Sequence, residues 1–267
     1  MDITVIIRCL RDRRVLECID SIDEDVEVIV STSHDDAFES FLQEHRIKYC
    51  LSAEGNLSVC SNVGFDTASF DKVIITDSDT IFEKGCIRRM FHGLDDCKIV
   101  RAKLKFDISK KIASSKLVAD ARDFVNSKEL TFTPGIGMRK DIVKDIGGFF
   151  FNDSVPFAVD ADLNYRVKRN GVKTDYLNDA IIVHRAESIR HDLKAAKRIG
   201  AGTAISARSL ASRYSTPEKD VRRSLKAIHL SDYHQMIRTK GICTFFYQVV
   251  WDICYHIGSI SRRLRRG

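Results

Sequence analysis

Residues 72 to 80 read Lys72-Val73-Ile74-Ile75-Thr76-Asp77-Ser78-Asp79-Thr80. The short run of β-branched residues is typical of a buried strand, and it ends in two carboxylates one residue apart. Because alternate strand residues point the same way, we expect Asp77 and Asp79 to project together from the carboxyl end of the strand. Two neighbouring carboxylates repel each other, and a divalent cation shared with substrate phosphates would relieve that repulsion. The nine residues fit equally a helix N-cap followed by a solvated turn.

Strands and helices alternate on both sides of this stretch. We expect strands at residues 3–7, 26–30, 47–50 and 98–105, and helices around residues 15–22, 38–42, 57–68 and 84–93. This alternation predicts βαβ units and a mostly parallel sheet with right-handed crossovers. Ligands of such sheets bind outside the carboxyl ends of the strands, where residues 33–36 and 77–79 would both lie.

The chain after residue 105 is less regular. No clear pattern is present in residues 106–127. A strand that approaches an irregular turn is predicted at residues 131–138. A short helix is predicted at residues 142–146, and Gly147-Gly148 would end it. Residues 159–171 predict a helix closed by Asn170-Gly171, and residues 173–177 and 180–183 predict two strands.

Three side chains in this part of the chain are candidates for chemistry. Asp162 and Arg166 are spaced for an i, i+4 ion pair, which leaves Asp160 as the acid without an obvious partner. His184 follows the last predicted strand, where a histidine is either a ligand or, more commonly, a capped or core residue.

Composition and charge suggest one large domain with an appendage. The 267 residues include eight cysteines without a CxxC pair, which favours free thiols in a reducing, cytoplasmic compartment, and we expect no signal peptide. The net charge is +6, but residues 188–267 carry 16 Lys/Arg and 5 Asp/Glu, a net charge of +11. We therefore predict a nucleotide-binding and catalytic domain at residues 1–187 and a basic helical extension at residues 188–267.

Phosphate-binding loops of the common kinds are missing from the sequence. No glycine fingerprint follows the first predicted strand, and no GxxxxGK[ST] motif occurs. These observations disfavour a dinucleotide-dependent oxidoreductase and a P-loop nucleotidase.

The ordered motifs resemble those of the family 2 glycosyltransferases with the GT-A fold, over roughly residues 2–190. The matching segments are Cys60-Ser61-Asn62, Asp77-Ser78-Asp79 as the DXD motif, Gly147-Gly148-Phe149, Val159-Asp160-Ala161-Asp162-Leu163 and His184. The sequence departs from the family pattern at Val159, which replaces a glutamate, at Ser31-Thr32, which stands where an Asp-Asp pair often meets the base, and at Ser61, which replaces an arginine.

The resemblance implies an α/β fold with a mixed, mostly parallel sheet, and a transferase that moves a sugar from a nucleoside-diphosphate sugar to an acceptor hydroxyl. It implies donor contacts from Thr32, Asp35, Asn62, Asp77 and Ser78, and Mg²⁺ or Mn²⁺ held by Asp77, Asp79 and His184. Asp160 would be the catalytic base, and a single displacement would invert the anomeric carbon.

The C-terminal residues predict an amphipathic helix. Apolar residues recur every 3.6 positions from Ile242 to Leu264, and Arg262-Arg263-Leu264-Arg265-Arg266 follows. Polar residues interrupt this run too often for a confident membrane span, and its pattern favours a helix in the lipid interface. The alternative is a helix packed on the catalytic domain. The membrane interpretation predicts a peripheral protein on the inner face of the cell membrane with a glycan or lipid-linked acceptor.

Two other functions share some of these features. A nucleotidyltransferase would also use an acidic metal site, but it needs a glycine-rich basic loop after the first strand, and residues 8–14 contain no glycine. A non-catalytic membrane or nucleic-acid adaptor would use only the basic tail. We expect no nucleic-acid partner, because the tail lacks a recognisable nucleic-acid module.

Overall fold

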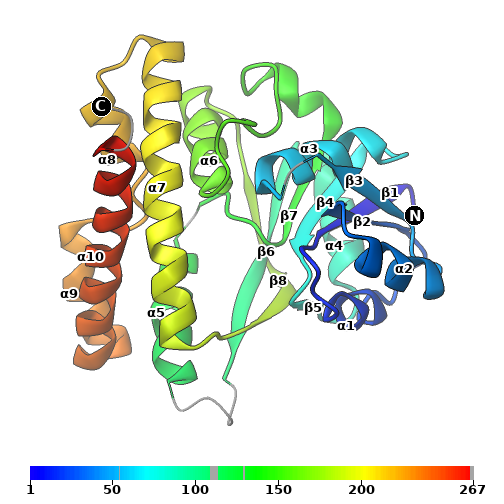
Figure 1. Cartoon of the computed structure of the whole chain (residues 1–267), viewed down its shortest axis with the longest axis horizontal. Helices are drawn as coiled ribbons and strands as arrows, with labels where there is room; N and C mark the ends of the chain where they lie inside the picture. Colours follow the sequence, from blue (N-terminus) through cyan, green and yellow to red (C-terminus); the bar gives the residue numbers. More distant parts are fainter. Residues whose placement is uncertain (54, 109–113, 129, 265–267) are drawn as a thin grey trace. The chain divides into compact units, whose positions relative to one another are not determined.

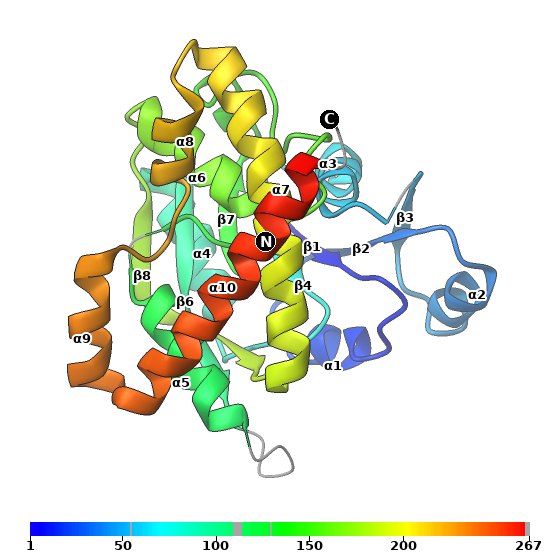
Figure 2. The same ribbon diagram turned by 60° about the vertical axis from the view of Figure 1, so that its left-hand side comes forward.

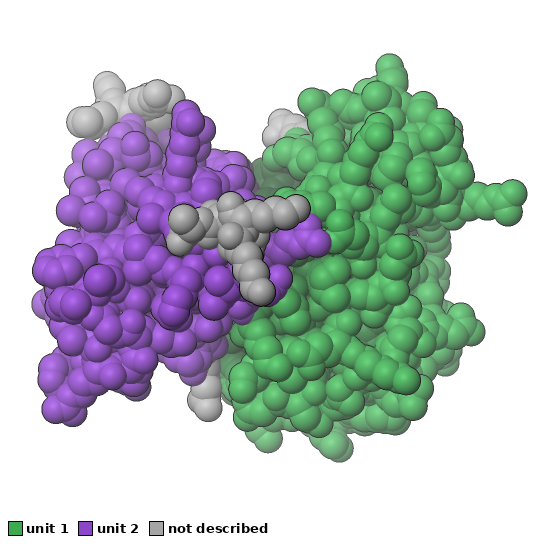
Figure 3. All heavy atoms as spheres, turned by 90° about the horizontal axis from the view of Figure 1, so that it is seen from below, with its two compact units in different colours: residues 1–105, 131–153, 166–184 green, residues 106–130, 154–165, 185–267 purple. Residues whose placement is uncertain are grey.

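The computed structural model describes residues 1–53, 55–108, 114–128 and 130–264. The chain divides into two compact units, coloured green and purple in Figure 3. Unit 1 comprises Met1–Lys105, Thr131–Asp153 and Arg166–His184, and unit 2 comprises Phe106–Leu130, Ser154–Tyr165 and Arg185–Gly267. The predicted domain boundary after residue 187 stays a prediction; the segment from residue 188 onward lies in unit 2 together with two earlier segments.

Unit 1 is built on a sheet with the strand order β3-β2-β1-β4-β7-β6-β8-β5 (Figure 1). The strands β3 (Tyr49–Ser52), β2 (Glu27–Ser33), β1 (Ile3–Arg8) and β4 (Lys72–Asp77) run parallel. Every residue of β1 is buried, so both faces of the sheet are covered there. In the pairing, Arg8 lies opposite Ser31 on one side and Asp77 on the other, so the carboxyl ends of β1 and β4 meet.

The other half of the sheet introduces antiparallel pairs. The strand β7 (Ile136–Arg139) is antiparallel to β4, and β6 (Ile99–Asp107) is antiparallel to β7. The three-residue strand β5 (Thr80–Phe82) follows β4 in the chain but pairs with β8 (Asp175–Arg185). This pairing places Thr80 opposite His184 and determines where the end of β8 lies.

Helices cover the sheet of unit 1. They are α1 (Val15–Asp20), α2 (Asp36–Glu44), α3 (Leu57–Thr67), α4 (Cys86–Asp96) and the short 3₁₀ helix η1 (Lys140–Lys144). The helix α3 approaches β1 closely, because a Cβ atom on Gly64 would lie 2.5 Å from Cγ2 of Ile6. The helix α4 packs on β7 through Met90 and Leu94, which are fully buried beside Gly137.

Unit 2 is helical. It contains α5 (Ser115–Asn126), α7 (Ile189–Tyr214), α8 (Glu218–Ser224), α9 (Leu230–Lys240) and α10 (Ile242–Leu264), and the helix α6 (Val159–Arg169) begins in it. The long helices α7 and α10 lie side by side (Figure 1 and Figure 2). One apolar cluster of this unit joins Tyr165, Ala207, Leu210, Val221 and Leu225.

The structure confirms the predicted fold class, a mixed α/β sheet with flanking helices and a C-terminal helical extension. It corrects three details. A single strand, β8 (Asp175–Arg185), stands where two strands were predicted at residues 173–177 and 180–183, and neither β5 nor α5 was expected. None of the described helices combines the length and the hydrophobicity needed to cross a bilayer. Arg265 and Arg266 of the predicted basic cluster lie outside the described residues.

Candidate active site

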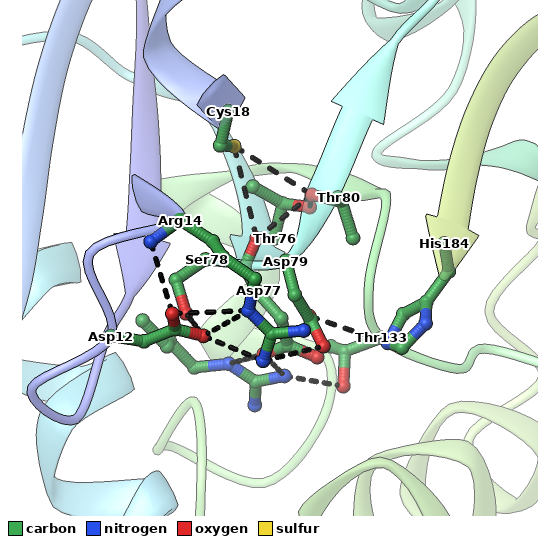
Figure 4. A network of polar contacts seen from close by, with 11 residues as sticks. Asp12, Arg14, Cys18, Thr76, Asp77, Ser78, Asp79, Thr80, Thr133 and His184 are labelled. Atoms are coloured by element: carbon green, nitrogen blue, oxygen red, sulfur yellow. Dashed lines mark hydrogen bonds and ion pairs between the residues drawn. The ribbon is translucent and has the colours of Figure 1, made fainter. Parts of the chain in front are cut away.

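The acidic stretch lies at the carboxyl end of β4 (Figure 4). The Arg8 guanidinium at the end of β1 donates to Oδ1 of Asp77 from Nε at 3.0 Å and from Nη2 at 2.6 Å. The same Nη2 donates to Oγ1 of Thr133 at 3.0 Å. The Arg8 side chain is 3% exposed and the Asp77 side chain is 29% exposed. A buried cation therefore holds one oxygen of Asp77, and part of this carboxylate remains accessible.

Asp79 lies beside His184 (Figure 4). The Nε2 atom of His184 is 3.3 Å from Oδ1 of Asp79 because β5 pairs with the end of β8. Burial raises the pKa of the Asp79 carboxyl; the charges of His184 and Arg14 lower it, and the charge of Asp77 raises it further. The net pKa is raised, so a cation bound here would stabilise the ionised form of Asp79.

The loop after β1 supplies a second pair of charges. Arg14 Nη2 lies 2.8 Å from Oδ2 of Asp12 and 3.6 Å from Oδ2 of Asp79. The hydroxyl of Ser78 donates to Oδ2 of Asp12 at 3.2 Å. Burial would raise the pKa of Asp12, but the hydrogen bonds from Arg14 and Ser78 outweigh it, and the pKa is lowered. Arg14 thus bridges two acids and ties this loop to the acidic stretch.

Hydroxyl groups fix the turn that carries the acids. The Oγ1 atom of Thr80 donates to the Asp77 carbonyl at 2.8 Å and lies 2.7 Å from Oγ1 of Thr76. The amide of Ser78 donates to the Arg8 carbonyl at 3.2 Å. These bonds fix the backbone of the turn that carries Asp77 and Asp79, and a preorganised site requires such support.

Thr32 and Asp35, two of the expected donor contacts, have hydrogen-bond partners within unit 1. Thr32 is fully buried at the end of β2, and its carbonyl accepts from the Ser52 hydroxyl at 3.2 Å. Asp35 caps α2 by accepting from the Phe38 amide at 2.9 Å, and its other oxygen lies 2.9 Å from Nε of Arg11. Their contacts with a nucleotide stay predictions.

Asn62 connects α3 to the segment that follows the glycine pair. Its Nδ2 donates to the Phe151 carbonyl at 2.9 Å and to Oδ1 of Asp153 at 2.7 Å, and its Oδ1 accepts from the Phe151 amide at 3.0 Å. The Asn62 side chain therefore positions this segment in unit 1. Its expected contact with the donor is a prediction beyond that role.

Arg166 fixes the glycine turn itself. Its fully buried guanidinium donates to the carbonyls of Ile146, Phe149 and Phe150 at 3.1, 3.0 and 2.6 Å. Gly147 and Gly148 have φ angles of +105° and +86°, which favour glycine over residues with a side chain. The match at residues 147–149 thus corresponds to a rigid turn held by a buried arginine.

Asp160 and Asp162 lie in the first turn of α6, within unit 2. Asp162 is fully buried and accepts from the Ser206 hydroxyl of α7 at 2.8 Å. Asp160 is partly exposed, and its Oδ1 accepts from the Ala161 amide at 3.0 Å. Of the two acids, Asp160 is the one whose carboxylate retains solvent access.

Neither a protein-family model nor a curated protein sequence matches the chain. Solved structures do match its fold. Staphylococcus aureus TarS 1-349 in complex with UDP aligns with a TM-score of 0.55 and 14% identity, covering 99% of this chain and 92% of that one. Glucosyl-3-phosphoglycerate synthase from Mycobacterium tuberculosis, in complex with Mn²⁺, UDP and glucosyl-3-phosphoglycerate, aligns with a TM-score of 0.53 and 16% identity, covering 80% of each chain.

The chain has the GT-A fold. At identities this low the likeness concerns the fold alone, and the chain spans only 55% of a longer TarS chain, with which it aligns at a TM-score of 0.54 and 15% identity over 98% of its own length. In this GT-A sheet the acidic stretch ends β4, a central strand, where open α/β sheets bind their ligands.

The contact between Asp79 and His184 fits a divalent metal. A carboxylate and an imidazole converge within 3.3 Å, and Mg²⁺ or Mn²⁺ sites typically use one or two carboxylates completed by substrate phosphates. Among the described residues, Asp77, Asp79 and His184 do not form a trio with all ligand atoms within 4.8 Å; the trio that does is His34, Asp36 and Glu39 on the surface. Arg8 holds Oδ1 of Asp77, so Oδ2 of this carboxylate is the oxygen left to bind a metal.

Sequence reasoning missed three charged residues of this site: Arg8, Asp12 and Arg14. The available signal was their position directly after the first strand, because the end of a parallel neighbour of β4 must lie beside its acidic residues. Residues 8–14 contain no glycine of a phosphate-binding loop, but they do carry these charged side chains.

Proposed function

We propose that this protein is a metal-dependent glycosyltransferase that uses a nucleoside-diphosphate sugar. The observation that carries the proposal is the contact between Asp79 and His184 at the carboxyl end of a central strand of a GT-A fold. TarS 1-349 in complex with UDP-GlcNAc has this fold at a TM-score of 0.54, 14% identity and coverage of 99% of this chain and 92% of that one, which favours a uridine nucleotide donor.

Asp77, Asp79 and His184 would hold Mg²⁺ or Mn²⁺. The metal, when bound, supplies a Lewis acid for the charge that develops on the departing diphosphate. Arg14 and the hydroxyl-fixed turn hold Asp79 in position before the donor arrives. Ser78, Thr32, Asp35 and Asn62 are the remaining proposed contacts of the donor.

Asp160 is the proposed catalytic base. Its carboxylate would accept the proton of the acceptor hydroxyl while that hydroxyl attacks the anomeric carbon, and one displacement inverts this carbon. Its partial exposure and the burial of Asp162 support this choice between the two acids of α6. The residue match of Val159–Leu163 to the family 2 motif is the other support.

The proposed acceptor is a hydroxyl of a glycan or lipid-linked glycan. All eight cysteines are free, which favours a reducing compartment, and we propose the cytoplasmic face of the membrane as the place of action.

One experiment separates donor binding from turnover. Mn²⁺ binding in the presence of UDP is followed by electron paramagnetic resonance, and hydrolysis or transfer is screened with a panel of nucleotide sugars. We expect Asp79→Asn to lose Mn²⁺ binding together with turnover. Asp160→Asn should retain Mn²⁺ and UDP binding while turnover falls by about 10²- to 10⁴-fold.

Asp66→Asn is the matched control, because Asp66 is an exposed acid on α3 outside the site. It should change neither measurement. Full turnover in the presence of excess chelator would contradict the metal role, and unchanged turnover in Asp160→Asn would contradict the role of the base.

A further inference from the structure

One side of α10 exposes large apolar side chains. They are Ile242, Phe246, Val250, Ile253, Ile257 and Ile260, each between 45 and 61% exposed, and we call them the apolar stripe. Their spacing of three or four residues puts them on one face of the helix, over a length of about 27 Å. A continuous exposed face of this kind marks an interaction surface.

The opposite face of α10 is buried and includes polar side chains. Thr244 and Gln248 are 1% exposed, and Arg122 of α5 donates to Oε1 of Gln248 at 2.8 Å. Gln248 in turn donates to Asp252 at 3.0 Å, and the hydroxyl of Tyr233 of α9 also donates to Asp252. The buried face thus combines these polar side chains with Tyr247, which packs on Val118 and Ala121, while the aliphatic and aromatic side chains of the apolar stripe stay outside.

Close backbone contacts fix this orientation. A Cβ atom on Gly200 of α7 would lie 1.9 Å from the Tyr255 carbonyl oxygen, and one on Gly258 of α10 would lie 2.0 Å from the Lys197 carbonyl oxygen. Rotating α10 to bury its apolar stripe would move Gly258 away from α7 and break the hydrogen bonds of Gln248. The exposure of the apolar stripe thus follows from the close packing of α10 on α7, which the glycines at positions 200 and 258 permit.

The charge of the surrounding chain points to an anionic partner. Four of the five acids after residue 187 make hydrogen bonds or ion pairs inside unit 2: Asp192 with Tyr247, Glu218 with Arg222, Asp232 with Lys128 and Asp252 with Tyr233. By contrast, Lys194 and Lys197 on α7 and Arg238 on α9 are exposed. Exposed cations on α7 and α9, the helices that contact α10, together with an uncharged apolar face fit a lipid-interface helix.

We propose that the apolar stripe of α10 docks on an anionic lipid surface, with its side chains among the acyl chains and the neighbouring cations at the headgroups. A second copy of this chain fits less well. Basic residues flank both ends of the stripe, Arg238 and Lys240 before it and Arg262 after it, so pairing two stripes in either direction would bring like charges together.

Vesicle co-sedimentation of the full chain tests this proposal without donor or acceptor, so its outcome is independent of the proposed sugar transfer. We expect binding to phosphatidylcholine vesicles that contain phosphatidylglycerol, weaker binding to phosphatidylcholine alone, and weakening by salt. The double variant Ile253→Ser/Ile257→Ser should lower the partition coefficient at least about tenfold.

Two controls isolate the stripe. Ile253→Leu/Ile257→Leu keeps the apolar surface and should bind like the wild type, and Leu51→Ser removes an exposed apolar side chain from β3 and should have no effect. Circular dichroism melts check that each variant is folded. Unchanged binding of the serine variant, no binding of the wild type, or a dimer that dissociates in the serine variant would overturn the proposal.

Discussion

Arg8 is an unusual residue for the interior of a sheet, because a buried guanidinium must find enough acceptors. Its Nε and Nη2 reach Asp77 and Thr133, while Nη1 is buried and has no hydrogen-bond partner among the described residues. Desolvation of two charges offsets much of their attraction, but removing one partner leaves the other charge buried and uncompensated. The pair therefore determines the position of Asp77 more than it adds net stability.

A double-mutant cycle on Arg8→Gln and Asp77→Asn measures this coupling. We expect Arg8→Gln alone to lower the free energy of unfolding by about 3 kcal/mol, because it leaves the Asp77 charge without its buried partner. The double variant should recover part of this loss, with a coupling of about 1 to 3 kcal/mol in urea unfolding. The pair Lys116–Asp120 on the exposed side of α5 is the control and should couple by less than about 0.5 kcal/mol. Additive losses at Arg8 and Asp77 would refute the coupling.

The residues of the site differ in how far the sequence could reveal them. Asp77 and Asp79 can be predicted because they directly follow the residues of an apolar strand in the sequence. His184 can be predicted because it follows residues 180–183, which themselves predict a strand. Arg8 pairs with an acid 69 residues later, so only the strand order β1-β4 brings them together. Arg166 was expected to pair with Asp162 on its own helix, but the sequence gives no sign that its guanidinium donates to three carbonyls some 16 to 20 residues earlier.

At the scale of elements, the helix pair α7–α10 depends on glycine. A methyl group at Gly200 would meet the Tyr255 carbonyl at 1.9 Å, and the rigid backbone there has no side chain that could move away. We expect Gly200→Ala to lower the free energy of unfolding of the full chain by about 2 kcal/mol or more in urea, although alanine is the better helix former. Ser261→Ala, on the exposed side of α10, should leave it unchanged. A stabilised Gly200→Ala variant would show that the two helices can separate at little cost.

The elements that sequence patterns missed each have a physical reason. The strand β5 has three residues, too few for any periodicity, and only its pairing with β8 defines it. In β8, Asn178 and Asp179 are exposed turn-type residues, which made one strand resemble two. The core side of α5 includes small alanines, Ala119 and Ala121, which give little hydrophobic contrast. By contrast, β1 to β4 and α2 to α4 have strong apolar patterns, and these were predicted.

At the scale of the whole chain, charge is divided unevenly along the sequence. Residues 1–187 carry 27 Lys/Arg and 32 Asp/Glu, a net charge of −5, against +11 for residues 188–267. The acids proposed to bind the metal lie in the net acidic part of the sequence, and the helix with the apolar stripe lies in the basic part. The proposed sugar transfer at a membrane-linked acceptor would use both properties, with the proposed metal ligands before residue 187 and the apolar stripe after it.

The stability of the whole chain in acid depends in part on Glu27, at the start of β2. Its carboxylate accepts from Lys48 Nζ at 2.5 Å and from the Ser69 hydroxyl at 2.7 Å, and it also accepts from Thr4, so it connects segments around β1 to β4. Burial would raise the pKa of Glu27, but these hydrogen bonds lower it from 4.5 to about 2.

Because the folded protein holds Glu27 ionised more strongly than the unfolded chain does, its contribution is complete above about pH 4.5 and is lost as the pH falls towards 2. We expect this group to account for at most about 3 kcal/mol of the fall in the free energy of unfolding over that range. Glu27→Gln should be less stable at pH 6 and should flatten the pH dependence of urea unfolding between pH 5 and 2 by that amount. An equally steep pH dependence in Glu27→Gln would place the acid sensitivity in other carboxylates.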